Sequence, residues 1–213
     1  MPEASPGQFK NTLEYELFIA INVCRHNPTA FSKFIGSKLQ DCPLLTKEGR
    51  KALKSVQKYL QGASAVAPLA NEDRISSAVA YVTEDIFSKV VDGSDNEEEG
   101  EEAKKSKKDN KDNSDKYKKL AEDVQNNIPA EVQKTFNAES VVGTARVMSG
   151  IDKELGFTIL ICDICNWVGD EKPERHPALN QHTKKIGLSV YPLGDDTQVV
   201  SVYYMNDYAN QMI

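Results

Sequence analysis

This chain of 213 residues lacks several features that would point to common classes of protein. No uninterrupted apolar run approaches the roughly 18 residues that a membrane span needs, so no membrane span is expected. The first residues, MPEASPGQFKNTLEYE, have no basic start followed by an apolar core, so we expect no secretory signal and a cytoplasmic location. Basic residues are not in excess, because the formal net charge is −6, and this disfavours a nucleic-acid-binding surface.

Cysteine is scarce. The four residues are Cys24, Cys42, Cys162 and Cys165. In a reducing compartment they should remain thiols, and we expect small, buried side chains. The alternative is a zinc site formed by Cys162, Cys165, His176 and His182, because tetrahedral zinc accepts two thiolates and two imidazoles. The sequence ILICDIC has the pattern of an apolar helix and not of a tight zinc-binding turn, so we favour buried thiols.

Hydrophobic residues make up only 39% of the chain, and part of this deficit is local. Residues 92–116 contain ten acidic residues and six lysines, which gives −4 of the net −6, and no apolar residue larger than Ala. Nothing there can offset the entropy of ordering the backbone. We therefore predict a single domain over residues 12–213, preceded by a tail at 1–11 and interrupted by a charged low-complexity insertion at 92–116. A tether to a charged partner is the other interpretation of this tract.

Apolar residues at helical spacing predict helices before the tract. Thr12 is the expected N-cap of the first, without the Glu three residues later that completes a capping box. Asn27-Pro28 breaks this helix and starts a second over 29–36, with Phe34 facing inward. A third helix, basic on one face, covers 46–61, and a long fourth follows Asn71. Two roles are open for Arg25, just before the break: a cation at the helix carboxyl end, which we favour, or a buried organiser of a loop.

The second half of the chain predicts strands around one helix. Residues 141–148 contain a β-branched run typical of a strand. Residues 157–168 have apolar residues three and four apart, which predicts a helix with one buried face. Alternation over 186–190 and the valines and tyrosines of 199–205 predict a terminal β-hairpin. The fold class is therefore α/β.

Several motifs follow one another in a recognisable order. They are NVCRHNPTAF (22–31), Pro68-Leu69 with the helix through Glu84-Asp85, Ala138-Glu139-Ser140, Trp167, His176 followed by Ile186-Gly187-Leu188, and Tyr203-Tyr204 with Asp207-Tyr208. Together they resemble the CAP superfamily of cysteine-rich secretory proteins, venom antigens, plant pathogenesis-related proteins and SCP-like microbial proteins. The resemblance covers most of residues 12–208 outside the charged tract. It implies a three-layer α-β-α sandwich around a small, mainly antiparallel sheet.

The resemblance also implies a cavity with two His and two acidic residues that can bind a divalent metal. It places one His at His176 and the acids at Glu139 and at Asp170 or Glu171. The other family His has no counterpart, because no His lies between His26 and His176. We therefore expect a vestigial pocket without metal or cofactor. An imidazole of His26 or His182 beside these acids would restore the metal-binding alternative.

These observations favour a non-catalytic interaction or scaffold protein in a larger intracellular assembly. The abundance of SCP-like proteins in protists suggests an assembly such as a cilium. We expect protein partners at the domain surface and at residues 92–116, and no nucleic acid. A protein that binds a divalent metal or small ligand through the residual cavity is the second hypothesis. An enzyme is the third, because neither Cys24 near His26 nor Ser140 near His176 comes with an evident oxyanion site or Gly-x-Ser-x-Gly elbow.

Overall fold

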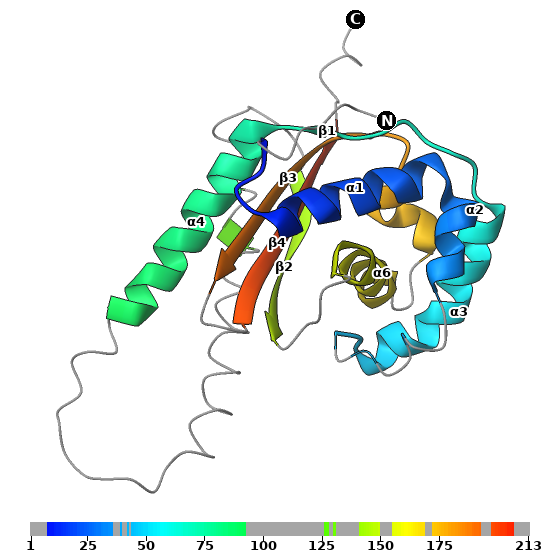
Figure 1. Ribbon diagram of the computed structural model, residues 1–213, viewed down its shortest axis with the longest axis horizontal. Coiled ribbons are helices and arrows are strands. Elements are labelled where there is room, and N and C mark those ends of the chain that lie inside the picture. The colour runs from blue at the N-terminus through cyan, green and yellow to red at the C-terminus, as the bar shows by residue number, and fades with distance from the viewer. Residues whose placement is uncertain are drawn as a thin grey trace, which may run out of the picture.

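Figure 1 shows the computed structural model, which describes residues 8–35, 39, 42, 44–92, 126–127, 130, 141–149, 155–168, 172–192 and 197–206. Expectations for the tail before residue 8 and for residues 93–116 of the charged tract lie outside these ranges. Within the described part of the chain, no helix has the length and apolar character needed to cross a membrane.

The helices precede the sheet strands or connect them. They are α1 (Thr12–His26), α2 (Pro28–Phe31), η2 (Ser32–Phe34), α3 (Lys47–Gly62), α4 (Asp73–Asp92), α6 (Leu155–Val168), η5 (Pro173–Arg175) and η6 (Pro177–Leu179). The predicted helices over 46–61 and 157–168 are confirmed as α3 and α6. Thr46 caps α3 because its side chain accepts the backbone N–H of Gly49 at 2.9 Å.

Four strands form one mixed sheet in the order β1-β3-β4-β2. They are β1 (Ala70–Asn71), β2 (Val141–Ser149), β3 (Thr183–Pro192) and β4 (Thr197–Asn206). The predicted hairpin is confirmed by the antiparallel pair of β3 and β4, and β2 is antiparallel to β4 on its other side. Only the short β1 is parallel to its neighbour β3. The α/β class predicted from the sequence is therefore confirmed.

Strand alternation divides the apolar residues into two cores, one on each face of the sheet. On β4, Val200, Val202 and Tyr204 belong to the larger core with residues of α1, α3 and α6. The alternate residues Val199 and Tyr203 belong to the smaller core with α4. In Figure 1, α4 accordingly lies on one side of the strands and α1 and α6 on the other. Helices therefore cover both faces of the sheet.

Three details of the helices differ from the sequence-based predictions. Helix α6 is buried around its circumference from residue 159 to 165, not on one face, because α1 and α3 enclose it together with the sheet. Asn11 and not Thr12 caps α1, by accepting the N–H of Glu14 at 2.9 Å. The predicted second helix loosens into a 3₁₀ turn at Ser32, and Phe34 is 58% exposed while it still contacts Phe157.

Side chains close the edge of β3 that β1 leaves unpaired. The N–H of Leu188 donates to Oγ of Ser76 on α4 at 3.2 Å. The next outward N–H, that of Val190, donates to Oε1 of Glu14 on α1 at 2.9 Å. The other carboxylate oxygen of Glu14 accepts the N–H of Lys10 at 2.9 Å. The edge therefore has fewer free donors for an additional strand.

Candidate functional site

The described residues bring together one buried group of ionisable side chains, between α6 and the sheet. Asp163 of α6 lies at its centre and His176 lies between η5 and η6. Thr144 Oγ1 of β2 donates to Asp163 Oδ1 at 3.0 Å, and Arg146 Nε lies 3.3 Å from the same oxygen. His176 Nε2 lies 3.3 Å from Asp163 Oδ2. The carboxylate is therefore held from three directions.

The surroundings of Asp163 favour its charged form. Burial alone raises the pKa of this carboxyl, but the hydrogen bond and charge of His176, followed by the charge of Arg146 and the hydroxyl of Thr144, outweigh it and lower the pKa below the usual value. The Asp163 and His176 side chains are 5% and 0% exposed, so the pair is closed to solvent. Arg146, one-third exposed, is the member of the group that reaches the surface.

Both ring nitrogens of His176 face protein groups. Its Nδ1 accepts the backbone N–H of Ala178 at 3.1 Å. In the neutral ring this places the proton on Nε2, which faces Asp163. Because the side chain is 0% exposed, neither nitrogen faces solvent in this arrangement. Asp163 orients the imidazole, and the imidazole in turn holds the start of η6.

Tyr204 forms the apolar wall of this group. Its ring meets that of His176 edge-on, with centroids 6.0 Å apart. Burial, with a contribution from the charge of Asp163, raises the pKa of the Tyr204 phenol well above its usual value, so the hydroxyl stays neutral. This hydroxyl has no hydrogen-bond partner among the described residues. The same holds for the hydroxyls of Ser201 and Tyr203, and the Tyr203 ring lies on the opposite face of the sheet.

Arg25 forms a second buried polar centre, 1% exposed. Its Nε donates to the carbonyl of Ala67 at 2.7 Å, and Nη1 donates to those of Ala178 and Asn180 at 2.8 and 3.0 Å. Nη2 donates to the carbonyl of Thr183 at 3.2 Å. Burial lowers the pKa of Arg25 to about 10, so the guanidinium remains charged at neutral pH. The favoured prediction, a cation at the end of the first helix, is wrong: Arg25 organises the loops.

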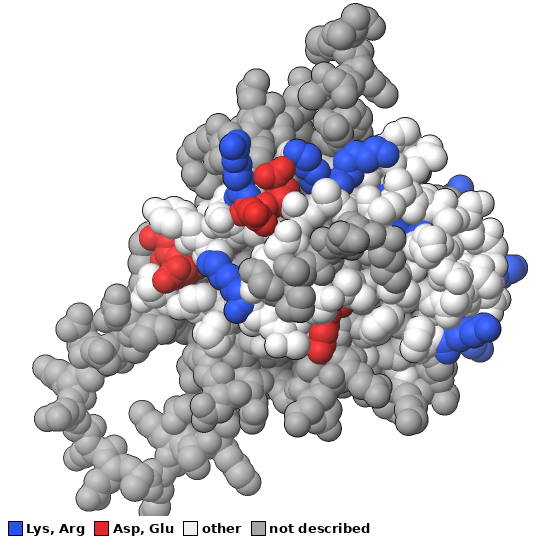
Figure 2. Space-filling view, turned by 45° about the horizontal axis from the view of Figure 1, so that its top comes forward, with Lys and Arg blue, Asp and Glu red and all other residues white. Residues whose placement is uncertain are grey.

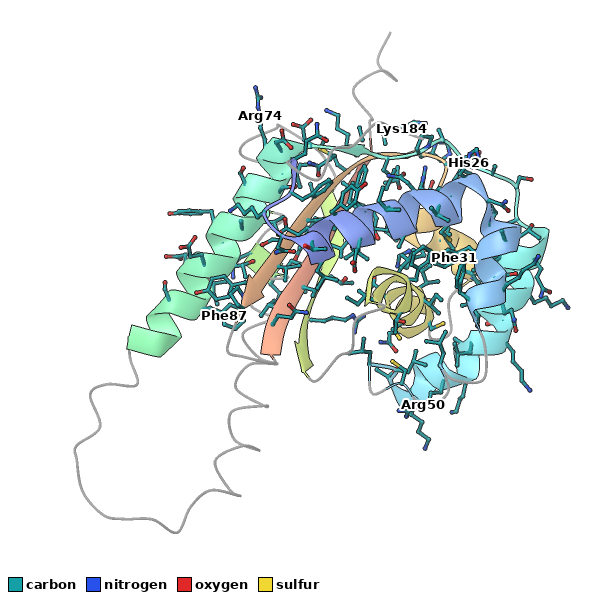
Figure 3. All side chains as sticks on the ribbon, in the orientation of Figure 1. His26, Phe31, Arg50, Arg74, Phe87 and Lys184 are labelled. Atoms are coloured by element: carbon teal, nitrogen blue, oxygen red, sulfur yellow. The ribbon has the colours of Figure 1, made fainter. Side chains whose placement is uncertain are left out.

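Of the cavity residues predicted from the resemblance, only His176 can be placed. Glu139, Asp170 and Glu171 lie outside the described residues. The acid that contacts His176 is Asp163, which the sequence analysis did not select. His26 and His182 are both exposed, and His182 Nε2 lies 3.3 Å from the Gln181 amide. Figure 3 shows His26 at the outer end of α1.

The zinc and thiol-nucleophile alternatives are not supported. Within the described ranges, no three His, Cys, Asp or Glu side chains are grouped as metal ligands, and this search includes both Cys162 and Cys165. All four cysteines are buried and free, as predicted. Burial raises the pKa of Cys24 and of Cys165 to about 12, which keeps both thiols protonated. Exposed His26 and buried Cys24 do not form a catalytic pair.

No family model, curated protein or solved structure matches this chain. The CAP resemblance therefore stays a prediction from short motifs. Within the first motif, the structure gives three polar residues, Asn22, Arg25 and Asn27, a structural role. Asn22 pairs with the backbone of Leu69, accepting its N–H at 2.7 Å and donating to its carbonyl at 3.3 Å. Asn27 caps α2 by accepting the N–H of Ala30 at 3.0 Å, and Arg25 forms the centre described above.

Proposed function

We propose that this chain is a non-catalytic, CAP-like interaction module that binds an acidic segment of a protein partner within a larger intracellular assembly. The observation that carries the proposal is the exposed basic face of α3. The Asp163–His176 pair supports the non-catalytic part, because both side chains are closed to solvent. Buried Cys24 supports it as well, since a nucleophile must reach its substrate.

Helix α3 separates apolar from basic residues. Gly49, Ala52, Leu53, Val56 and Leu60 face the core. The residues at three- and four-residue intervals on the opposite side are exposed and basic: Lys47, Arg50, Lys51, Lys54 and Lys58. Glu48 is the single acidic residue of the helix. In Figure 3, Arg50 points away from the body of the protein. We call these five cations the α3 basic face.

The α3 basic face stands out because the rest of the molecule is not basic. The formal net charge is −6. Figure 2 shows acidic and basic residues mixed over the left, top and centre of the view, whereas the right-hand edge, over α2 and α3, shows only basic and uncharged residues among those described. A local positive surface on an acidic protein attracts a short acidic segment while the remaining charge repels a long polyanion. An acidic polypeptide therefore fits better than a nucleic acid.

The test measures binding of a fluorescent oligoglutamate peptide to the full chain by anisotropy at low and moderate salt. We expect Lys51→Glu with Lys54→Glu to weaken binding about tenfold, because exposed charge pairs contribute up to roughly 1 kcal/mol each. The matched control is Arg74→Glu with Lys184→Glu, which changes the net charge equally. Both residues are exposed, and Figure 3 places them far from Arg50.

Three results would contradict the proposal. One is an equal loss in both double variants, which would mean that only net charge matters. Another is the absence of peptide binding by the unaltered chain. The third is tighter binding of a single-stranded RNA of equal charge. For the assembly itself, a pull-down at both salt concentrations should compare the full chain with one lacking residues 92–116. Both chains keep the α3 basic face, so we expect both to recover the same defined complex.

A further inference from the structure

Two thiols from distant parts of the chain meet in the larger core. Cys162 Sγ on α6 lies 3.6 Å from Cys42 Sγ in the segment before α3, and 120 positions separate them in sequence. Cys42 is 9% exposed and Cys162 2%. Cys24 and Cys165, both within the described residues, make no sulfur–sulfur contact. The proximity is therefore specific to one pair of the four thiols.

The corner around these sulfurs is held by a second contact one turn further along α6. Asn166 Nδ2 donates to the carbonyl of Leu44 at 2.8 Å, and Asn166 Oδ1 accepts the N–H of Thr46 at 2.9 Å. Cys162 and Asn166 are four residues apart, so both side chains project from the same side of the helix, towards Cys42 and residues 44–46. The clamp fixes the segment that carries Cys42 relative to α6.

Close packing of α3 on α6 supports the same geometry. A Cβ at Gly49 would overlap the side-chain oxygen of Asn166, so a larger residue there would displace this amide from Thr46. On the other side, Arg50 Nη2 donates to the carbonyl of Cys42 at 3.3 Å, and the N–H of Leu45 donates to the same carbonyl at 3.1 Å. The backbone of Cys42 is thus tied to α3 while its sulfur faces α6.

We propose that Cys42 and Cys162 are a redox modification site, at which a low-molecular-weight disulfide such as oxidised glutathione converts the two thiols into a reversible intrachain disulfide. A disulfide bond is about 2.05 Å long. The sulfurs therefore have to approach by roughly 1.5 Å, a movement that side-chain rotation and a small shift of the Cys42 segment can supply.

The reaction proceeds in two balanced steps. Cys42, the more exposed thiol, attacks oxidised glutathione as its thiolate, which forms a mixed disulfide and releases one glutathione that takes up the Cys42 proton. Cys162 then attacks the Cys42 sulfur, forms the intrachain bond and releases the second glutathione with the Cys162 proton. The protein loses two electrons and two protons, and glutathione gains them. Burial chiefly raises the pKa of Cys162, so Cys42 is the thiol that attacks first.

The bond would close a long loop that contains α3, α4 and β2. Cross-linking such distant positions restricts the unfolded chain, so the oxidised protein should need more denaturant to unfold than the reduced protein. It would also fasten the α3 basic face to α6. The inference does not depend on the proposed function, since cross-linking and peptide binding are measured separately.

The test incubates the native full chain with oxidised glutathione, denatures it, labels remaining thiols with N-ethylmaleimide and maps peptides by mass spectrometry without reduction. We expect two labelled thiols and a cross-linked peptide pair that contains Cys42 and Cys162. Dithiothreitol should restore four labelled thiols. Labelling of all four after oxidation, a cross-link that involves Cys24 or Cys165, or only cross-links between chains would overturn the proposal.

Matched variants sharpen the result. Cys165 is three residues from Cys162 on the same helix. Its replacement, Cys165→Ala, should leave the cross-link and the shift of the denaturation midpoint intact. Cys42→Ala and Cys162→Ala should each abolish both. If a core variant fails to fold, the peptide map of the unaltered chain still decides the matter, because it needs no substitution.

Discussion

Four backbone carbonyls converge on the guanidinium of Arg25. The planar fork matches this set because it directs several N–H groups at fixed angles in one plane. The carbonyl of Arg25 itself accepts the N–H of Val66 at 2.9 Å. One residue therefore ties the end of α1 both to the segment before β1 and to the loop before β3. A lysine would retain the charge but not the geometry.

Replacement of Arg25 tests this conclusion at the residue scale. We expect Arg25→Lys to lower the free energy of unfolding by at least about 2 kcal/mol, since hydrogen bonds to a charged group contribute about 1.5–3 kcal/mol each. Arg25→Met should cost about 3–5 kcal/mol because it leaves buried carbonyls without donors. Urea denaturation followed by circular dichroism measures both. Arg74→Lys, on the exposed side of α4, should change stability by less than about 0.5 kcal/mol.

Asp163 should make the fold sensitive to acid. Its pKa is lower in the folded protein than the value of about 3.9 expected when unfolded, so the unfolded chain binds the proton more readily. The stability that Asp163 contributes is therefore complete above about pH 4 and is lost as the pH falls through the lower folded pKa. We expect Asp163→Asn to be less stable at neutral pH by about 3 kcal/mol.

The Asp163→Asn variant should also lose less stability than the unaltered chain as the pH falls below about 4, because the contribution of Asp163 is lost as the pH falls through its lowered pKa. Urea midpoints across this range provide the measurement. Asp73→Asn, an exposed acid in the first turn of α4, is the control and should retain the full acid dependence. Parallel pH profiles for Asp163→Asn and the unaltered chain would contradict the assignment.

At the residue scale, the buried roles of Asp163 and Arg25 were predictable from their apolar neighbours in the sequence. Asp163 interrupts the apolar run ILICDIC, and a charge within a helix buried on all sides requires a partner. Arg25 follows apolar and small residues in α1 in the same way. The CAP resemblance selected His176 but could not supply Asp163, since that contact depends on where η5 and η6 lie against α6.

At the scale of elements, small residues decide how closely the layers approach. Gly187 of β3 lies beneath α4, where an added Cβ would overlap the side chain of Ile75 and come within 2.8 Å of the N atom of Ser76. The same stretch of α4 supplies the Ser76 hydroxyl that accepts the N–H of Leu188. Close packing and closure of the β3 edge therefore have a common origin.

Two Gly→Ala substitutions distinguish the effect of close packing on stability from the effect of backbone flexibility. Gly187→Ala should lower the free energy of unfolding by about 1–3 kcal/mol, the usual cost of excess volume in a packed layer. Gly62→Ala, at the end of α3, meets no atom within 4 Å and should be neutral or stabilise by up to about 1 kcal/mol. Thermal unfolding of both variants checks the expectation. Similar changes in the two would show that the α4–β3 contact is not tight.

Most elements were predictable because their periodicity is strong. The alternation on β3 and β4 predicted the hairpin, and the apolar spacing of α3 predicted both its buried and its basic face. The cap of α1 was misplaced by one residue, since Asn11 and Thr12 are both good N-caps and only the position of Glu14 distinguishes them. Phe34 was expected inside because aromatic residues usually are, but the 3₁₀ turn rotates it outward.

At the scale of the whole molecule, the two described cores share the sheet, and residues 92–116 contain no apolar residue larger than Ala that could join a core. A chain lacking 93–116 should therefore keep its free energy of unfolding within about 1 kcal/mol, because the entropy of closing a loop changes slowly with its length. Urea denaturation of the full and shortened chains provides the comparison. Loss of cooperative unfolding in the shortened chain would show that this segment belongs to the fold.

The long sequence separation between Arg25 and its carbonyl acceptors determines when the domain can fold during synthesis. Three of its carbonyl acceptors are 153 to 158 positions later in the sequence. At roughly 5–20 residues per second, a ribosome needs on the order of 10–30 s to reach them after Arg25 has been made. During that interval Arg25, which is 1% exposed in the folded protein, lacks three of its carbonyl acceptors. The domain therefore closes only near the end of its own synthesis, and a chaperone that holds apolar helices has that whole interval in which to bind.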